Sequence, residues 1–191
     1  MIQNLWATPF FKDKAASDIT SRMVTALLQE FDILNAPNDF GTVNVLDSKH
    51  PDIVEFKQTV VYPSFNKFLK ETVGKDISGW AGHRMHGWLA GSGHDYSLTY
   101  HNHRGSQISA VFYLLCEEHN SGGRITFTDP RQNSNRGYDE SFFPWFEDVH
   151  FIPESGDIAV FPSFLYHHVA TYQSNLRIAM PVDLFLHTQR W

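Results

Sequence analysis

The stretch that decides the fold class spans residues 96–115 and reads YSLTYHNHRGSQISAVFYLL. It contains two short segments, 96–103 and 107–115, that are rich in the β-branched and aromatic residues favoured in strands. In the first segment, the alternation of side chains along a strand places His101 and His103 on the same face. Two imidazoles side by side can reach one metal ion, so the pattern indicates a metal site on a β-structure.

The regions on either side of this stretch differ in character. Residues 1 to about 75 predict mostly helix, with apolar residues at helical spacing over 17–31 and 51–73 and a short strand at 41–46 between them. Residues 80–187 predict short strands bounded by Gly, Pro, Asn or Ser. These strands are 83–90, 96–103, 107–115, 124–128, 157–161, 166–171 and 176–186.

Helices followed by many short strands favour one fold class. We expect a mainly β fold with flanking N-terminal helices, in which a jelly-roll core is covered by the helices on one outer face. The polar segment 129–150 is too long for a turn and predicts a surface loop over the cleft. With no linker or repeat in the sequence, residues 1–191 are expected to form a single domain.

The composition excludes several classes of protein. The net charge is −6, and without a basic cluster we expect no nucleic-acid partner. The chain lacks a long apolar run and a signal-like start, so we expect a cytoplasmic protein that does not bind membranes. The single Cys116 cannot form an internal disulfide or a multi-cysteine metal site. The 11 histidines therefore remain the most promising metal ligands.

A second group of candidate residues lies in the C-terminal third of the chain. His167 and His168 begin a predicted strand, and because adjacent strand residues face opposite ways, only one of them can join the first pair. Ten residues after His167, Arg177 lies on an otherwise apolar strand. A buried arginine requires an anionic partner.

These residues together resemble the iron(II)- and 2-oxoglutarate-dependent oxygenases, which have a double-stranded β-helix core. In that family a His-x-Asp (or Glu) pair and a distant His bind iron, and an Arg or Lys further along holds the far carboxylate of 2-oxoglutarate. The order His101, His103, His167 and Arg177 matches this arrangement. The resemblance implies that the three histidines bind Fe(II), that Arg177 binds 2-oxoglutarate with help from Tyr113, and that O2 is the oxidant.

The resemblance extends to neighbouring segments. Residues 108–114 resemble the strand after the first ligand pair, and Gly122-Gly123 resembles the start of the strand that follows it. Residues 129–131, Asp-Pro-Arg, and the opening 5–10 are similar to a compact bacterial and phage branch related to prolyl-hydroxylase-like enzymes. The implied reaction is hydroxylation of a small molecule or of a protein side chain.

The sequence departs from the family pattern at one important position. His103 stands where the family has a carboxylate, so the site is either a three-histidine centre or is completed by Asp95 or Asp129. His168 competes with His167 for the last ligand position, and the family's His-x-Val pattern favours His167.

Two other functions are compatible with three histidines. A cupin-type three-histidine metalloenzyme usually has a Glu shortly after His-x-His, but residues 104–107 contain no acid, and a cupin has no need of Arg177. A non-catalytic metal-binding jelly-roll module remains open because of His103.

Overall fold

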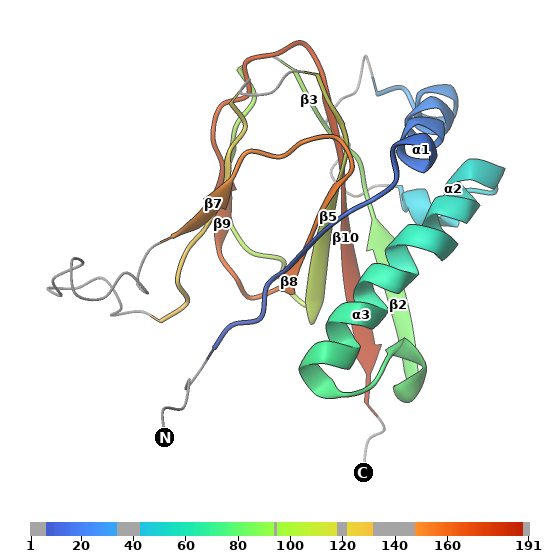
Figure 1. The fold of residues 1–191 in the computed structure, drawn as a ribbon, viewed down its shortest axis with the longest axis vertical. Helices are drawn as coiled ribbons and strands as arrows, with labels where there is room; N and C mark the ends of the chain where they lie inside the picture. The colour runs from blue at the N-terminus through green and yellow to red at the C-terminus, as the bar shows by residue number, and fades with distance from the viewer. Residues whose placement is uncertain (1–6, 34–42, 94, 118–121, 132–147, 189–191) are drawn as a thin grey trace, which may run out of the picture.

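Two antiparallel sheets face each other, and helices cover the outer face of the larger one (Figure 1). The computed structural model describes residues 7–33, 43–93, 95–117, 122–131 and 148–188. The larger sheet has the order β1-β8-β5-β10-β2, with β3 also paired to β10, and the smaller sheet has the order β4-β9-β6-β7. This arrangement is the predicted jelly-roll. The strands are β1 (Phe11–Lys14), β2 (Gly82–Gly87), β3 (Ala90–Ser92), β4 (Leu98–His101), β5 (Ile108–Cys116), β6 (Ile125–Phe127), β7 (Val149–Phe151), β8 (Asp157–Pro162), β9 (His167–Val169) and β10 (Arg177–His187).

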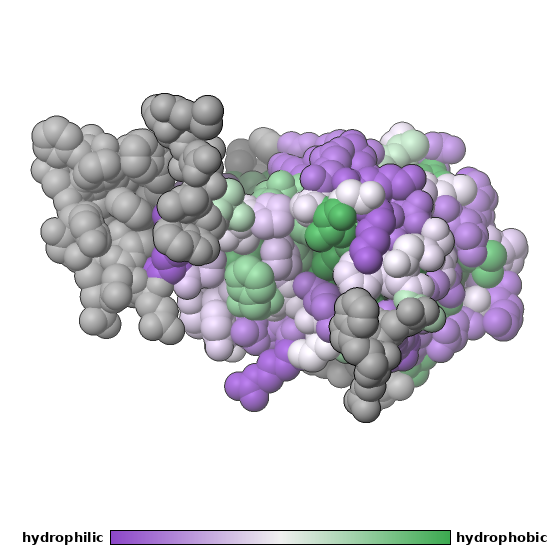
Figure 2. Space-filling model, turned by 90° about the horizontal axis from the view of Figure 1, so that it is seen from below, coloured by the Kyte–Doolittle hydropathy of each residue, from purple (hydrophilic) through white to green (hydrophobic). Residues whose placement is uncertain are grey.

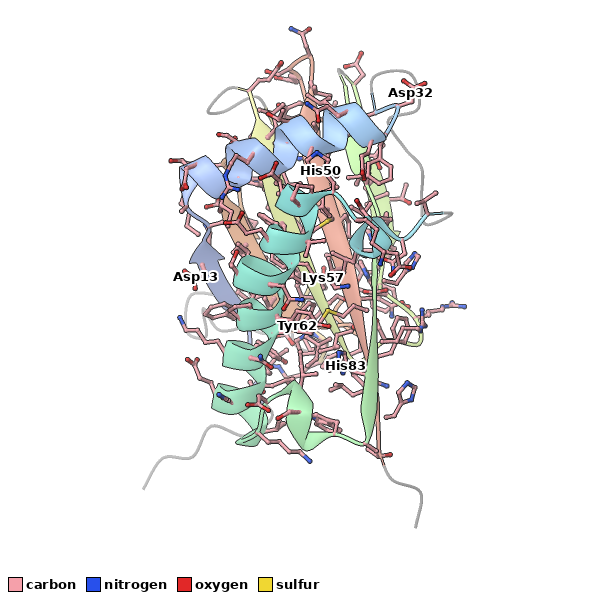
Figure 3. The ribbon with its side chains drawn as sticks, turned by 90° about the vertical axis from the view of Figure 1, so that its right-hand side faces the viewer. Asp13, Asp32, His50, Lys57, Tyr62 and His83 are labelled. Atoms are coloured by element: carbon pink, nitrogen blue, oxygen red, sulfur yellow. The ribbon has the colours of Figure 1, made fainter. Side chains whose placement is uncertain are left out.

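The helices form the outer layer, as predicted. They are α1 (Ser17–Glu30), α2 (Pro51–Phe56) and α3 (Tyr62–Val73), together with short 3-10 turns η1 (Val45–Asp47) and η3 (Ile77–Gly79). Tyr62 of α3 and His83 of β2 point toward each other between the helices and the sheet (Figure 3), with the tyrosine Oη 3.2 Å from His83 Nε2. Seen from below, mostly hydrophilic residues cover the helical side (Figure 2). None of the described helices is both long and apolar enough to span a bilayer.

The second predicted helix contains a local widening. Between α2 and α3 the backbone forms a π-type turn, η2 (Lys57–Val61), so that the helix continues from Pro51 to Val73. Pro63 lacks an N–H and cannot donate the usual helical hydrogen bond, and a wider turn just before it accommodates the missing bond. The helix ends at Gly74, whose φ of 77° terminates it in the left-handed conformation.

Alternation along the central strands separates two apolar clusters. Phe112 of β5 faces the helices, where its ring meets that of Phe56 at 5.8 Å, whereas Tyr113 faces the smaller sheet. On β10, Met180 likewise belongs to the helical cluster, whereas Ala179 belongs to the cluster between the sheets. We call the space between the two sheets the inter-sheet interior, and it contains the candidate site described below.

The predicted strand at 41–46 is wrong in the part that the structure describes. Residues 41–42 lie outside the described residues, and Val45–Asp47 forms a 3-10 turn. The side-chain amide of Asn44 donates to the Met85 carbonyl at 3.1 Å and accepts from the Gly87 N–H at 2.9 Å. A side chain therefore fixes this segment to β2 without a strand ladder.

Two further segments differ from the prediction. Phe11–Lys14, in the region predicted as mostly helical, pairs with β8 as an edge strand, and its polar sequence FKDK concealed it. Of the predicted loop 129–150, residues 132–147 lie outside the described residues, whereas Val149 and His150 belong to strand β7. Each of the seven strands predicted after residue 80 overlaps an observed strand.

Candidate functional site

Three histidines meet where β4 and β9 pair. His101 ends β4 and lies opposite His167, the first residue of β9, and His103 follows two residues later. One ring nitrogen of each lies within 4.8 Å of the others. Because metal–nitrogen bonds of about 2.1 Å put two ligand atoms at most about 4 Å apart, small rotations of the rings suffice to bind one ion. The predicted convergence of these residues is confirmed.

The hydrogen bonds of His101 and His167 fix which nitrogen is free. His101 Nδ1 donates to the Thr99 carbonyl at 2.7 Å, and His167 Nδ1 donates to the Leu165 carbonyl at 3.0 Å. A carbonyl oxygen can only accept, so in both rings Nδ1 carries the proton and Nε2 has the lone pair. This is the tautomer that metal-binding histidines adopt when a second group orients the ring.

Both rings are kept neutral by their surroundings. Burial lowers the pKa of His101, and the nearby His103 lowers it further. Burial also lowers the pKa of His167, which is 2% exposed, to about 3, with an added contribution from His101. Neutral imidazoles at physiological pH can bind a cation without first losing a proton.

His103 is oriented by a carboxylate. Its Nδ1 lies 2.8 Å from Oδ1 of Asp183, which also accepts a hydrogen bond of 2.6 Å from Ser109 Oγ. Asp183 is buried on β10. Asp183 is not among the residues predicted from the sequence, although an acid inside the apolar run 178–186 is a signal that could have indicated it.

The other proposed ligands lie elsewhere. Among the residues that the structure describes, neither Asp95 nor Asp129 joins the histidine cluster. Asp129 forms an ion pair with Arg131, and Asp95 is exposed with a φ of 66°. His168 is in register with Thr126 on the smaller sheet and does not belong to the cluster, in agreement with the preference for His167.

Arg177 lies at the start of β10, and its predicted burial is confirmed. It is 4% exposed, donates from Nη1 to the Gly123 carbonyl at 3.0 Å, and has its guanidinium 5.0 Å from the centre of the Tyr172 ring. Gly123 has a φ of 68°, and a Cβ at this position would collide with the guanidinium. A planar group with several donors in this setting suits a carboxylate.

The model of the family described as "Putative 2OG-Fe(II) oxygenase" matches residues 86–183, which is just over half of the chain and includes the candidate site residues described above. The chain belongs to this family. No curated protein sequence matches the chain.

Solved structures of 2OG-Fe(II) oxygenases share the fold. A Pseudomonas putida prolyl-4-hydroxylase is 12% identical with a TM-score of 0.63, over 97% of this chain and 91% of that one. The collagen prolyl hydroxylase of Paramecium bursaria Chlorella virus-1, solved with 2OG, is 10% identical with a TM-score of 0.58, over 94% and 96%. HygX from Streptomyces hygroscopicus, solved with nickel and 2-oxoglutarate, is 14% identical with a TM-score of 0.58, over 93% and 82%. These similarities show the double-stranded β-helix fold.

The residues of this family member fit both groups that the family name implies. For iron, the three histidines offer ring nitrogens that lie within 4.8 Å of one another, and burial favours the neutral form of His101 and His167. For 2-oxoglutarate, the hydroxyl of Tyr96 is buried and has no hydrogen-bond partner among the described residues. Burial raises the pKa of Tyr96 and the positive charge of Arg177 opposes that rise, so the two groups are neighbours. An unsatisfied buried hydroxyl near a guanidinium suits a ligand that brings acceptor oxygens.

Tyr113 lies where the resemblance implied. It is 2% exposed in the inter-sheet interior and pairs in register with Ala179, two residues beyond Arg177. Burial raises the pKa of Tyr113, and the charge of Arg177 lowers it. The phenol therefore stays protonated and can donate to an anion held by Arg177.

Proposed function

We propose that this protein is an Fe(II)- and 2-oxoglutarate-dependent dioxygenase that hydroxylates a small molecule or a protein side chain. The observation that carries the proposal is the set of three histidines around one point, with a buried arginine in the same inter-sheet interior. When bound, iron and 2-oxoglutarate together activate O2 and couple oxidative decarboxylation of the cosubstrate to hydroxylation of the substrate. Family membership favours this function over the cupin-type alternative.

The residues have separate tasks in this proposal. His101, His103 and His167 would bind iron from one side, which leaves the remaining positions of an octahedron for other ligands. Arg177 would hold the far carboxylate of 2-oxoglutarate in charge-assisted hydrogen bonds, and Tyr113 would donate to the same carboxylate.

Aromatic rings shield His103 and His167 from water. Phe127 and Phe161 each place a ring 5.2 Å from that of His167, and Trp88 lies 5.5 Å from His103. A dry environment strengthens the hydrogen bonds that hold an anion and limits loss of reactive species to solvent.

The test is an anaerobic titration of the metal-free protein with Fe(II) and 2-oxoglutarate. A weak visible charge-transfer band that needs both components, followed by succinate after O2 is admitted, is the expected result. His167→Ala should abolish iron binding, whereas Arg177→Ala should keep iron and lose most of the 2-oxoglutarate affinity.

The exposed Arg124 provides a matched control, because Arg124→Ala removes an arginine near Gly123 without touching the interior. Equal losses in Arg177→Ala and Arg124→Ala would contradict the role of Arg177. Metal uptake with neither band nor succinate would refute the dioxygenase and leave the non-catalytic metal-binding module.

A further inference from the structure

His103 is held in a different way from the other two histidines. His101 and His167 donate to main-chain carbonyls of their own segments, two residues earlier in each case. His103 instead reaches across to Asp183, 80 residues away in the sequence, at 2.8 Å. The one histidine that replaces the family's carboxylate is therefore the one paired with a carboxylate.

The strands on either side of Asp183 hold it in position for this contact. Asp183 lies in the middle of β10, with Ser109 of β5 on one side and His86 of β2 on the other. Its side chain is 12% exposed and that of His103 is 6% exposed. A carboxylate buried in the centre of a sheet is costly unless donors surround it, and here the donors are the imidazole and a hydroxyl.

A chain of three serines reinforces the carboxylate. Ser106 Oγ lies 2.8 Å from Ser163 Oγ, which lies 2.8 Å from Ser109 Oγ, which lies 2.6 Å from Asp183. Since an ionised carboxylate only accepts, Ser109 must give its one proton to Asp183, and Ser163 must then give its proton to Ser109. Ser106 completes the series by donating to Ser163 at 2.8 Å, and the His103 carbonyl is a longer second acceptor of the same proton at 3.2 Å. All three hydroxyl dipoles point toward the negative charge and stabilise it.

The same residues also fix the backbone that carries His103. The N–H of His103 donates to the Ser163 carbonyl at 3.1 Å, and the N–H of Ser163 donates to the Gln107 carbonyl at 3.1 Å. Ser163 is 1% exposed, so the middle of this connection is shielded from water. The turn after β8 and the turn after β4 therefore hold each other, and the ring of His103 is constrained at its backbone and at Nδ1.

We propose that Asp183, supported by Ser109, Ser163 and Ser106, is a positioning residue that directs Nε2 of His103 at the metal and supplies, one hydrogen bond from the ion, the negative charge that three imidazoles lack. This inference rests on the proposed function, because it assumes that His103 binds the metal. The bond to the carboxylate makes Nε2 a better donor to a cation. The charge of Asp183 thereby stands in for that of the family's metal-bound carboxylate, and the imidazole of His103 lies between Asp183 and the ion.

Cobalt(II) is a suitable probe, because its visible bands report both affinity and coordination without turnover. Asp183→Asn keeps the size of the side chain and an oxygen that can accept from His103, but removes the charge. We expect it to weaken Co(II) binding about 10–100-fold and to change the visible bands. Ser109→Ala, which removes one of the two donors to the carboxylate, should weaken binding by a smaller factor, about 2–10-fold.

Asp157→Asn is the matched control. Asp157 is also a buried aspartate on the larger sheet, 6% exposed, but it pairs with Lys12 and Lys14 and accepts from the Glu154 N–H. The Asp157→Asn variant should bind Co(II) with the affinity of the wild type. A second measurement separates positioning from general damage: in a His103→Ala background, adding Asp183→Asn should cause no further loss of affinity, because Asp183 acts through His103.

Three outcomes would overturn the inference. Wild-type Co(II) affinity in Asp183→Asn would refute the inference. It would also be refuted if adding Asp183→Asn to His103→Ala lowered the Co(II) affinity by the same factor as it does in the wild type. If Asp183→Asn fails to fold, Ser109→Ala decides the matter, and unchanged affinity there also refutes the proposal. Failure of the metal site itself is distinguishable, since wild-type protein would then bind Co(II) no better than His101→Ala or His167→Ala. Failure of the dioxygenase alone would leave the Co(II) affinities as expected here, but the iron-loaded wild type would form no succinate.

Discussion

Replacing Gly123 by alanine should damage the 2-oxoglutarate site and spare the metal site. The carbonyl of Gly123 accepts a hydrogen bond of 3.0 Å from Arg177, and its φ is 68°. An added Cβ would collide with the guanidinium and lie 2.9 Å from the Tyr172 ring. We therefore expect Arg177 to be displaced from the position in which it would hold a carboxylate.

The expected magnitude has two parts. The left-handed backbone costs alanine about 1–2 kcal/mol of folding free energy. Displacing the guanidinium weakens its charge-assisted hydrogen bonds to the cosubstrate, a loss of about 1.5–3 kcal/mol. The second amount corresponds to an increase of roughly 10–150-fold in the dissociation constant of 2-oxoglutarate.

Gly74→Ala is the control for backbone strain. Gly74 has a similar φ of 77°, and no atom lies within 4 Å of a Cβ added there. Both variants should lose thermal stability through backbone strain, with a further loss from the collision in Gly123→Ala. Gly123→Ala alone should lose 2-oxoglutarate affinity, measured anaerobically with Fe(II) bound. Equal 2-oxoglutarate affinity in the two variants would refute the proposed relation between Gly123 and Arg177.

Three other outcomes are expected. The pKa of His167 is about 3 in the folded protein and near 6.5 in the unfolded chain, so the unfolded state binds protons first and the Tm of the metal-free protein should fall as the pH drops from 6.5 toward 3. His167→Gln should reduce that fall, and the same pH dependence of Tm in His167→Gln as in the wild type would contradict this prediction. Phe56→Ala should lower the free energy of unfolding by about 3–5 kcal/mol in denaturant titrations but leave Co(II) affinity intact, because the ring packs on the helical side of the larger sheet. The ring of Trp88 lies 5.5 Å from that of His103, a proposed ligand of the ion, so bound Co(II) should quench the fluorescence of Trp88. Trp88→Phe should remove most of that quenching.

The parts of the fold that follow from local patterns could be predicted from the sequence. Short β-rich segments after residue 80 predict the strands, strand alternation places His101 and His103 on one face, and the resemblance to the oxygenase family adds His167. These predictions succeed because strand alternation is a local property, and because a buried cation in an apolar strand is unusual enough to be noticed.

Contacts between distant segments could not be read in this way. The Asp183–His103 bond joins residues 80 positions apart, and the sequence around either residue does not identify the other as its partner. Asn44 fixes its segment through its side chain, so hydrophobic periodicity wrongly predicted a strand there. β1 is an exposed, charged edge strand, and its pairing with β8 depends on a partner more than 140 residues away.

The three histidines do not belong to one rigid element. His101 and His167 lie on the smaller sheet, whereas His103 is tied through Asp183 to the larger one. An ion bound by all three is then a cross-link between the layers, and its binding free energy adds to the energy that keeps the layers together. The distance between the two sheets consequently sets the geometry of the ligands, so a cavity made at Phe161 should change the affinity for the metal. Loss of the metal should in turn speed amide hydrogen exchange in β4 and β9.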